Sequence, residues 1–425
     1  MRRVIKFGGT SIADPDRMRR AAECVTRLTE AGEQVAVVLS AMGDDTNRLL
    51  TAAYAVANGG ADPQDVYRIA LQGEQNSVLM MCAALKSLKV TPVPFIPTDR
   101  ENWPIIVDSD DNSPIATTKI NEERSITLRS EKTQQRFRRY VTPHLRGGAV
   151  PVIAGFFALS STEQLVTLGR GGSDITAFIA GRYIGADEVI IVTDVEGVLD
   201  ADPRMAGKNA KLIEELSVED LEAMSGAGSR VIHPRALRFK TEEIKARIMD
   251  YKNLDRLGSS GTTILGSSQA SIFTNPAKLA VVTLVGTNLA RQAGLLAEIA
   301  DRLSGIPINS IVGTDRFIQI YLDDRRGEEA YSVLHNFLAE HRDAFQNITI
   351  KGDIGEIRLR SSSFIDEPGV LSEITGLISS RRINVLEIVT MLSDIYIYVH
   401  WDNIRDAAGA LSAMVETAPT LFQEN

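Results

Sequence analysis

The chain has 425 residues, of which 44% are apolar and 24% charged, and its formal net charge is −9 at pH 7. This composition is ordinary for a soluble globular protein with two or three domains. The acidic excess argues against binding to nucleic acid, so an anionic substrate would have to be held by local positive groups.

The two cysteines, Cys24 and Cys82, lie in apolar runs that read as helical. We expect both to be buried thiols in a reducing compartment and not a disulfide. No run of 18 apolar residues and no signal-peptide pattern is found, which predicts a cytoplasmic protein that has no membrane partner.

Strands and helices alternate over the first two-thirds of the chain. Short apolar runs predict strands at residues 4–7, 34–40, 149–155 and 188–193. Amphipathic or helix-favouring stretches predict helices at residues 14–31, 45–57, 63–88, 173–184, 217–224 and 234–245. Because near-continuous apolar strands are buried on both faces, this alternation predicts an α/β fold with an open, mostly parallel sheet sandwiched by helices.

The pattern changes after about residue 270. Residues 273–276, Phe-Thr-Asn-Pro, read as a linker, and two βαββα units follow, the first with a visible closing strand. This order of elements is that of a ferredoxin-like βαββαβ domain. The sequence therefore predicts a catalytic domain over residues 1–270 and two ferredoxin-like domains over 271–352 and 353–425.

The first of two glycine-rich turns follows the first predicted strand. Lys6 lies near the end of that strand, and Gly8 and Gly9 come directly after it. Glycines let backbone N–H groups approach phosphate oxygens because no Cβ stands in the way. A lysine supplies a point charge for a transferring phosphoryl group. We therefore expect these three residues to contact phosphate.

The second glycine-rich turn, residues 169–174, reads Gly-Arg-Gly-Gly-Ser-Asp and leads into a helix. Ser173 or Asp174 is expected to cap that helix, and a glycine turn alone is weak evidence of phosphate binding. Arg170 strengthens it, because a guanidinium can hold a carboxylate in bidentate geometry. The two turns together indicate a kinase that is neither of the Walker type nor of the protein-kinase type.

Other polar residues lie near strand ends, where open α/β sheets place ligands. Ser40 follows an apolar strand with Thr46 just beyond, and Glu74 precedes an apolar helical run, where we expect it to bind an ammonium group. Thr193 and Asp194 open an acidic loop that is suited to orient magnesium or a nucleotide.

The second repeat carries a turn that is typical of a small-ligand pocket. Asp366 and Pro368 are followed by Gly369, Val370 and Leu371 at the start of a predicted helix. Proline and glycine at a helix start leave N–H groups exposed. The sequence therefore predicts a pocket there for a small carboxylate effector.

Seven motifs occur in a fixed order along the chain: VIKFGGTS, LSAMGDDTNRLL, LQGEQ, AGF, TLGRGGSD, TDVEGVLDADPR and RVIHPRAL. In order and spacing they resemble the aspartate kinases (aspartokinases) of the amino-acid kinase superfamily. The doubled βαββα unit resembles the tandem ACT regulatory domains that such enzymes carry. The resemblance covers the whole chain, and seven motifs in order are more specific than any single glycine pattern.

The resemblance implies a role for each matching position. Ser40 and Thr46 match groups near the substrate side-chain carboxylate, and Glu74 matches the residue that receives the α-amino group. Arg170, with Ser173 beside it, matches the residue that holds the α-carboxylate. The implied catalytic residues are Lys6, Asp174 and Arg170. The implied ATP-binding residues are Lys6, Gly8, Gly9, Thr193, Asp194, Asp202, Arg204 and Arg230.

The chain departs from the family pattern at several positions. Leu199 stands where a tyrosine is usual, Asp200 where a threonine or serine is usual, and Arg230 where a lysine is usual. The first two bear on nucleotide stacking and affinity, and the third keeps the charge but changes its geometry. The first ACT-like unit lacks the Asp-x-Pro-Gly turn at residues 287–294, so we expect its effector pocket to be lost or altered.

The resemblance implies ATP-dependent phosphorylation of the L-aspartate side-chain carboxylate to 4-phospho-L-aspartate, the first step of aspartate-family amino-acid biosynthesis, with Mg²⁺ as cofactor. A carboxylate is already ionised near pH 7, so the reaction needs charge neutralisation and positioning and no strong base. His233 is accordingly read as structural, and no residue is assigned as a metal ligand.

Two alternatives stay open. One is a kinase of the same fold that acts on a different amino acid or carboxylate, and the other is a catalytically silent regulator that binds amino acids. The expected partners are a small amino-acid substrate and an amino-acid effector. Because ACT-like sheets have open edges that commonly pair, we also expect a homodimer formed through residues 280–425.

Overall fold

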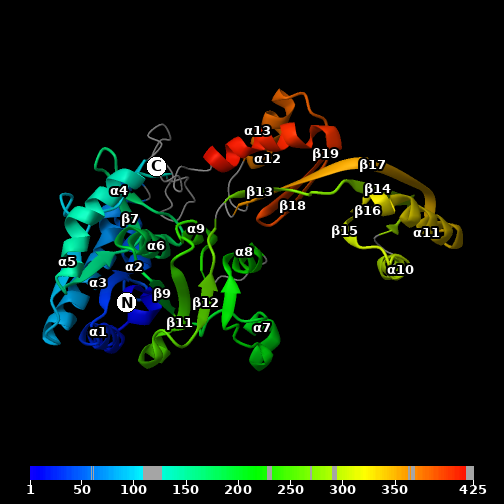
Figure 1. The fold of residues 1–425 in the computed structure, drawn as a ribbon. Helices are drawn as coiled ribbons and strands as arrows, with labels where there is room; N and C mark the ends of the chain where they lie inside the picture. The colour runs from blue at the N-terminus through cyan, green and yellow to red at the C-terminus, as the bar shows by residue number, and fades with distance from the viewer. Residues whose placement is uncertain are drawn as a thin grey trace. The chain divides into compact units, whose positions relative to one another are not determined.

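The computed structural model divides the chain into two compact units, Met1–Gln269 and Ala270–Thr420 (Figure 1). The structure describes residues 1–58, 60, 62–108, 127–226, 232–268, 270–289, 294–361, 364 and 369–417. No helix in these ranges is both long enough and apolar enough to cross a membrane.

The first unit is built on an eight-stranded sheet in the order β10-β12-β11-β9-β1-β2-β6-β3. Its strands are β1 (Arg2–Phe7), β2 (Gln34–Leu39), β3 (Pro92–Phe95), β6 (Val150–Ala154), β9 (Glu188–Thr193), β10 (Glu215–Ser217), β11 (Lys245–Asp250) and β12 (Thr262–Leu265). Each neighbouring pair is parallel except β11 with β12. The predicted open, mostly parallel sheet is confirmed.

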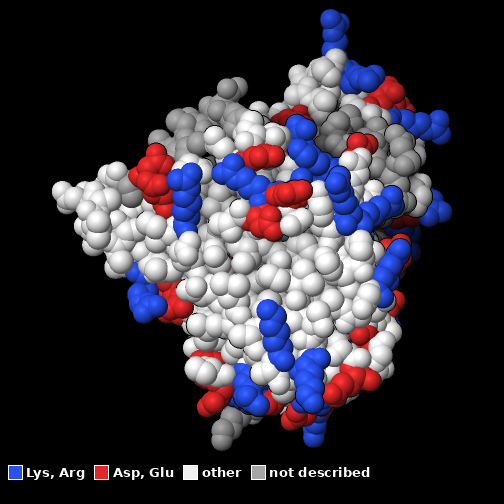
Figure 2. Space-filling model, turned by 90° about the vertical axis from the view of Figure 1, so that its left-hand side faces the viewer, with Lys and Arg blue, Asp and Glu red and all other residues white. Residues whose placement is uncertain are grey.

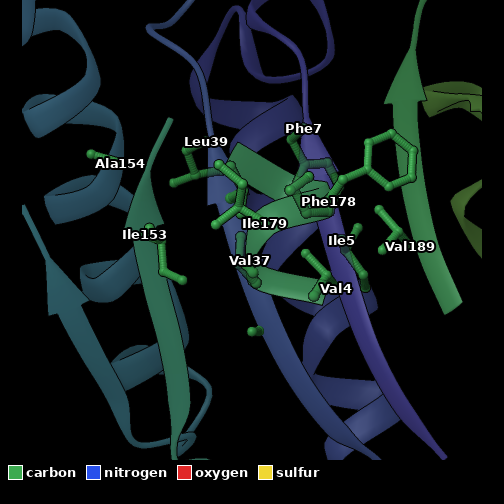
Figure 3. Close-up of a cluster of buried hydrophobic side chains, with 14 of the residues drawn as sticks. Val4, Ile5, Phe7, Val37, Leu39, Ile153, Ala154, Phe178, Ile179 and Val189 are labelled. Carbon is green, nitrogen blue, oxygen red and sulfur yellow. The ribbon is translucent and has the colours of Figure 1, made fainter. Parts of the chain in front are cut away.

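Helices cover both faces of this sheet. Val4 and Ile5 point to opposite faces of β1, and both are fully buried. Figure 3 shows them packed with residues of β2, β6, β9 and α6. The α-helices of this unit are α1 (Pro15–Glu30), α2 (Asp45–Val56), α3 (Pro63–Ser87), α4 (Ser130–Arg136), α5 (Thr142–Arg146), α6 (Gly172–Ile184), α7 (Pro203–Ala206), α8 (Val218–Gly226) and α9 (Pro234–Leu237).

A second, four-stranded sheet lies in the same unit. It has the order β5-β4-β7-β8 and is formed by β4 (Ile106–Asp108), β5 (Thr127–Leu128), β7 (Phe157–Ser160) and β8 (Leu165–Thr167). Only Gly155 and Phe156 separate β6 of the large sheet from β7 of the small one. The chain therefore turns sharply between the two sheets at this point.

One predicted helix is wrong. We expected residues 234–245 to be helical, but α9 ends at Leu237 and β11 begins at Lys245. Ala246, Ile248 and Met249 of β11 are fully buried between β9 and β12. Burial of this strand on both faces outweighs the helix-favouring local sequence.

The prediction that both cysteines are buried thiols is confirmed. Cys24 and Cys82 are free and buried, and burial raises the pKa of each thiol to about 11.

On the face that Figure 2 shows, Lys and Arg side chains are interspersed with Asp and Glu around a broad area without charged side chains. Neither sign dominates that face.

The second unit contains two repeats that share one strand. Its strands are β13 (Ser271–Thr274), β14 (Leu279–Gly286), β15 (Ile308–Gly313), β16 (Phe317–Asp323), β17 (Phe345–Arg360), β18 (Val385–Met391) and β19 (Asp394–His400), and its α-helices are α10 (Leu295–Arg302), α11 (Gly327–Glu340), α12 (Val370–Ser380) and α13 (Ile404–Thr417). The first part of β17 pairs with β14, and its last part pairs with β19. The boundary that we predicted at residue 352/353 therefore falls inside a continuous strand.

The proposed linker at residues 273–276 is partly wrong. Ser271–Thr274 forms β13, which pairs antiparallel with Ile357–Arg360 of β17. β13 thus serves as the closing strand of the second repeat. The first repeat is thus inserted in the chain between two strands of the second, which local sequence patterns do not reveal.

The two repeats contact each other through equivalent tyrosines. Tyr321 of β16 stacks on Tyr398 of β19 with ring centroids 4.1 Å apart. The Tyr321 hydroxyl donates to Glu387, and the Tyr398 hydroxyl lies 3.1 Å from Ser310 Oγ. Burial is the main cause that raises the pKa of both phenols. The repeats are therefore joined by a paired, hydrogen-bonded aromatic contact.

Candidate active site

Lys6 lies on β1, a central strand of the large sheet, and its ammonium group forms an ion pair. It is in register with Val38 of β2 and Ile191 of β9. Its Nζ is 2.6 Å from Asp174 Oδ1 in the first turn of α6, and both side chains are nearly buried. The sequence predicted both residues as catalytic, and the structure brings them into direct contact.

The first glycine turn is closely packed by backbone on several sides. The Gly8 N–H donates to Val192 O at the end of β9 (3.0 Å), and Ser11 Oγ donates to the same oxygen (3.0 Å). A Cβ on Gly9 would lie 2.7 Å from Ala41 O and 3.0 Å from Gly43 O. Glycine is needed at position 9 because there is no space for a side chain.

The second glycine turn uses left-handed backbone. Gly169 and Gly171 have φ of 72° and 73°, where an L side chain is strained. The N-cap of α6 is Gly171, without a side-chain hydrogen bond, so the predicted capping by Ser173 or Asp174 is wrong. The reason is that these side chains bind elsewhere, Asp174 to Lys6 and Ser173 Oγ to Ser40 Oγ at 2.9 Å.

Two residues that the sequence did not assign to the site lie against this turn. A Cβ on Gly171 would lie 2.5 Å from His233 Cβ, and a Cβ on Gly172 would lie 2.8 Å from Phe156 Cδ2. His233 had been read as structural, and a packing role beside the turn is compatible with that reading. Phe156 is the last residue of the AGF motif, and the only sequence feature that could have pointed to it is its position directly after a buried strand.

Glu74 is a buried carboxyl group in the middle of α3. Its side chain is 3% exposed, and Oε2 has no hydrogen-bond partner. Burial raises its pKa from 4.5 to about 8, partly offset by hydrogen bonds from backbone N–H groups, including that of Ala41. Thr46 lies nearby, with its Oγ1 3.6 Å from the position of a Cβ on Gly73. A buried carboxyl with a free oxygen is suited to receive a cationic group.

Arg170 lies between β8 and α6, and its side chain is exposed. The turn thus presents a guanidinium to solvent while Ser173 and Asp174 tie its helical end to β2 and β1. A guanidinium held on such a turn can bind a carboxylate through two hydrogen bonds.

The predicted nucleotide residues are placed only in part. Thr193 ends β9, and its hydroxyl donates to Asp194 Oδ1 at 3.2 Å. The carbonyl of Asp202 accepts from the N–H groups of Met205 and Ala206, which starts α7, the helix that contains Arg204. Arg230 lies outside the described residues.

Two of the departures from the family pattern have structural partners. Leu199 forms an isolated antiparallel bridge with Leu212. The Asp200 N–H donates to Lys211 O, and Asp200 Oδ1 accepts from the Lys211 N–H at 2.8 Å. Both residues therefore hold the 199–200 segment against the 211–212 segment.

A cavity of about 400 Å³ lies at the N-terminus of α12 in the second unit. Its lining includes Gly369, Val370 and Leu371, three of the residues that we predicted to bind an effector. Gly369 has φ 93° and precedes the helix. Asp366 and Pro368 lie outside the described residues. The cavity also has Phe364, Ser372, Thr390, Leu392 and Ile395 in its wall.

The ends of β1, β2 and β9 and the start of α6 thus meet at one edge of the large sheet. Opposite charges, glycine turns and an unpaired buried carboxyl gather there, as expected for a site that binds a small zwitterion and a phosphate. No group of three or more His, Cys, Asp or Glu side chains in the described ranges could hold a metal ion.

Comparisons with known proteins agree with this geometry. The model of the amino acid kinase family matches residues 1–250. Aspartokinase 2 of Bacillus subtilis is 27% identical over 403 residues, which are 91% of each chain. The crystal structure of aspartate kinase from Synechocystis has a TM-score of 0.78 at 21% identity and covers 100% of this chain and 71% of that one.

Aspartokinase III of E. coli, solved in complex with aspartate and ADP, has a TM-score of 0.53 at 22% identity over 97% of this chain and 99% of that one. At such identities the two structural matches establish the fold. The family model, however, matches more than half of the sequence. The chain therefore belongs to the amino acid kinase family.

Proposed function

We propose that the protein is an aspartate kinase, which transfers the terminal phosphoryl group of ATP to the side-chain carboxylate of L-aspartate. The observation that carries the proposal is the juxtaposition of the Lys6–Asp174 ion pair with the glycine turn of Arg170. The product is 4-phospho-L-aspartate, the first intermediate of aspartate-family amino-acid biosynthesis. The full-length similarity to aspartokinase 2 of Bacillus subtilis supports this choice of substrate.

The amino acid is held at both of its charged α-groups. Glu74 receives the α-ammonium group, because its buried Oε2 lacks a partner. Arg170 holds the α-carboxylate through its two-pronged guanidinium. Ser40 and Thr46 contact the side-chain carboxylate. This arrangement favours a free ammonium, since only a cation can ionise and pair the buried carboxyl group of Glu74, which burial otherwise keeps protonated near pH 7.

Lys6 acts on the transferring phosphoryl group. In the free protein Asp174 holds the Lys6 ammonium at the edge of the sheet beside Gly8. Charge on the phosphoryl oxygens is neutralised there by the ammonium and by backbone N–H groups of the first turn. The attacking carboxylate is already ionised near pH 7, so no general base is needed.

The nucleotide lies over the end of β9. Thr193, Asp194, Asp202 and Arg204 are assigned to bind it, with Gly8 and Gly9 at the phosphates, and the resemblance adds Arg230, which lies outside the described residues. Mg²⁺ would supply charge neutralisation between the phosphates. No residue is assigned as a ligand of this ion, because magnesium usually keeps several waters and takes phosphate oxygens as ligands.

The second unit regulates the first through a small amino-acid effector. The lining of the cavity at α12 includes the left-handed Gly369 and the first residues of that helix, and a helix N-terminus suits a carboxylate. We assign it as the effector site of the second ACT-like domain. A homodimer formed through residues 280–425 and a domain limit at residue 270 belong to the same proposal.

A steady-state assay with ATP, Mg²⁺ and either aspartate, glutamate or N-acetylglutamate tests the function. We expect ADP release that depends on aspartate and formation of an acyl phosphate that hydroxylamine traps. Arg170→Ala should raise the KM for aspartate by about a hundredfold and leave the KM for ATP nearly unchanged. Activity on glutamate alone, or no turnover with any of the three, would refute the assignment.

A further inference from the structure

Phe156 has a left-handed backbone between the two sheets of the first unit. Its φ is 73°, a region that is strained for an aromatic residue. A sharp corner between β6 and β7 alone would favour glycine at this position. A phenylalanine that keeps this conformation indicates that its side chain makes packing contacts and its backbone groups make hydrogen bonds that offset the strain.

The backbone of Phe156 holds both ends of the turn that carries Arg170. Its carbonyl accepts from the Leu168 N–H at 2.7 Å, just before the turn. Its N–H donates to Thr176 Oγ1 at 3.2 Å, and that hydroxyl donates to Gly172 O at 2.9 Å, two residues after Arg170. Thr176 is fully buried, so no water replaces this bridge.

The ring of Phe156 occupies the space beside Gly172. A Cβ on Gly172 would lie 2.8 Å from Phe156 Cδ2 and 3.1 Å from Phe156 Cα. On its other side the ring packs at right angles against Phe157, with centroids 5.1 Å apart. The start of α6 is therefore held in place by a rigid aromatic contact as well as by hydrogen bonds.

We propose that Phe156 and Thr176 are positioning residues that fix both ends of the segment 168–172 and so set the direction of Arg170 toward the amino-acid substrate. This inference rests on the proposed role of Arg170 in binding the α-carboxylate. Phe156 contacts the turn at Leu168, Thr176 and Gly172. The Lys6 side of α6 is held separately, by the ion pair of Asp174 and the hydrogen bond of Ser173. Loss of Phe156 should therefore affect aspartate and not ATP.

Thr176→Val and Thr176→Ser test the hydroxyl bridge. Valine has nearly the same shape but cannot join Phe156 N–H to Gly172 O, and serine can. We expect Thr176→Val to raise the KM for aspartate about tenfold and to leave the KM for ATP within twofold. Thr176→Ser should restore the KM for aspartate to within about twofold of the wild type.

Phe156→Gly tests the ring, because glycine keeps the left-handed backbone without strain. We expect a severalfold rise in the KM for aspartate and faster amide hydrogen exchange at residues 169–172, measured by mass spectrometry. Lys89→Gly is the matched control: Lys89 also has positive φ, 61°, but is exposed at the end of α3. That change should alter neither quantity.

The inference is overturned if Thr176→Val and Phe156→Gly lower the thermal unfolding temperature but leave both the KM for aspartate and the exchange at 169–172 unchanged. Their role would then be structural only. If the wild type does not phosphorylate aspartate, the proposed function fails, yet hydrogen exchange in the two variants still decides whether Phe156 holds the turn. The two failures are therefore distinguishable.

Discussion

The two glycine turns of the active site use the same residue for different physical reasons. In the first turn Gly9 is needed for space, since a Cβ would lie 2.7 Å from Ala41 O. In the second turn Gly171 is needed for its backbone conformation, with φ 73°, and also for space, since a Cβ would lie 2.5 Å from His233 Cβ. A glycine in these turns can therefore be required for lack of space, as at position 9, or for a left-handed backbone as well, as at position 171.

The turns differ also in what their charged residues do. The first turn supplies Lys6, whose ammonium is already paired with Asp174 in the free protein. The second supplies Arg170, whose side chain is exposed. We infer that the first turn is organised before substrate arrives and serves catalysis, whereas the second gains its ligand on binding and serves recognition.

Lys6→Met is expected to have the largest effect on this comparison. Removing the only proposed side-chain cation of the first turn should lower kcat by about a thousandfold, because the charge acts on the transferring group. Steady-state kinetics checks this. The double variant Lys6→Met/Asp174→Asn avoids an unpaired carboxylate and should be equally inactive, while Lys245→Met, at an exposed lysine of β11, should be normal. A loss of less than tenfold would mean that Lys6 was misassigned.

Among glycine substitutions in the two turns, Gly171→Ala should lower the free energy of unfolding the most. We expect a loss of about 3 kcal/mol in the free energy of unfolding, from left-handed strain together with the contact to His233. Gly32→Ala is the control, because Gly32 has φ 81° with nothing within 4 Å of its Cβ position, so only about 1 kcal/mol is expected. Urea unfolding measures both. Equal losses would show that the His233 contact contributes nothing.

The sequence predicted the parts of this site more reliably than their connections. Lys6, Asp174 and Arg170 were found because glycines and charges stand together locally, and the parallel sheet followed from apolar strands. The cap of α6 was assigned to the wrong residue because Ser173 and Asp174 bind Ser40 and Lys6, more than 130 positions away. β13 was missed for the same reason, since its partner lies more than 80 residues further on.

Glu74→Gln tests the buried carboxyl group whose Oε2 has no hydrogen-bond partner. Below pH 4.5 the group is protonated in both the folded and unfolded states. Between pH 4.5 and about 8 only the unfolded chain ionises, so the free energy of unfolding should fall as pH rises. The variant should lack this fall and be more stable than wild type at pH 8, by on the order of 1–3 kcal/mol, while binding aspartate more weakly.

Urea unfolding at pH 5 and pH 8 measures this difference, with the exposed Glu131→Gln as the control. Aspartate binding gives a second readout. If the substrate ammonium ionises Glu74, calorimetry at pH 7 in buffers of different ionisation enthalpy should detect the release of about one proton. Release of a proton from the Glu74→Gln variant as well would exclude Glu74 as its source.

Ser173→Ala should have the smallest effect, because it removes a single hydrogen bond between the second turn and the end of β2. Ser173 Oγ and Ser40 Oγ are 2.9 Å apart and join the second turn to the end of β2. Loss of a partly buried, neutral hydrogen bond costs about 1 kcal/mol, so kcat/KM for aspartate should fall about fivefold. The double variant Ser40→Ala/Ser173→Ala should lose more than the single one, because Ser40 is also proposed to contact the side-chain carboxylate of the substrate. An equal loss in the two variants would mean that Ser40 acts only through its hydrogen bond to Ser173 and does not contact the substrate.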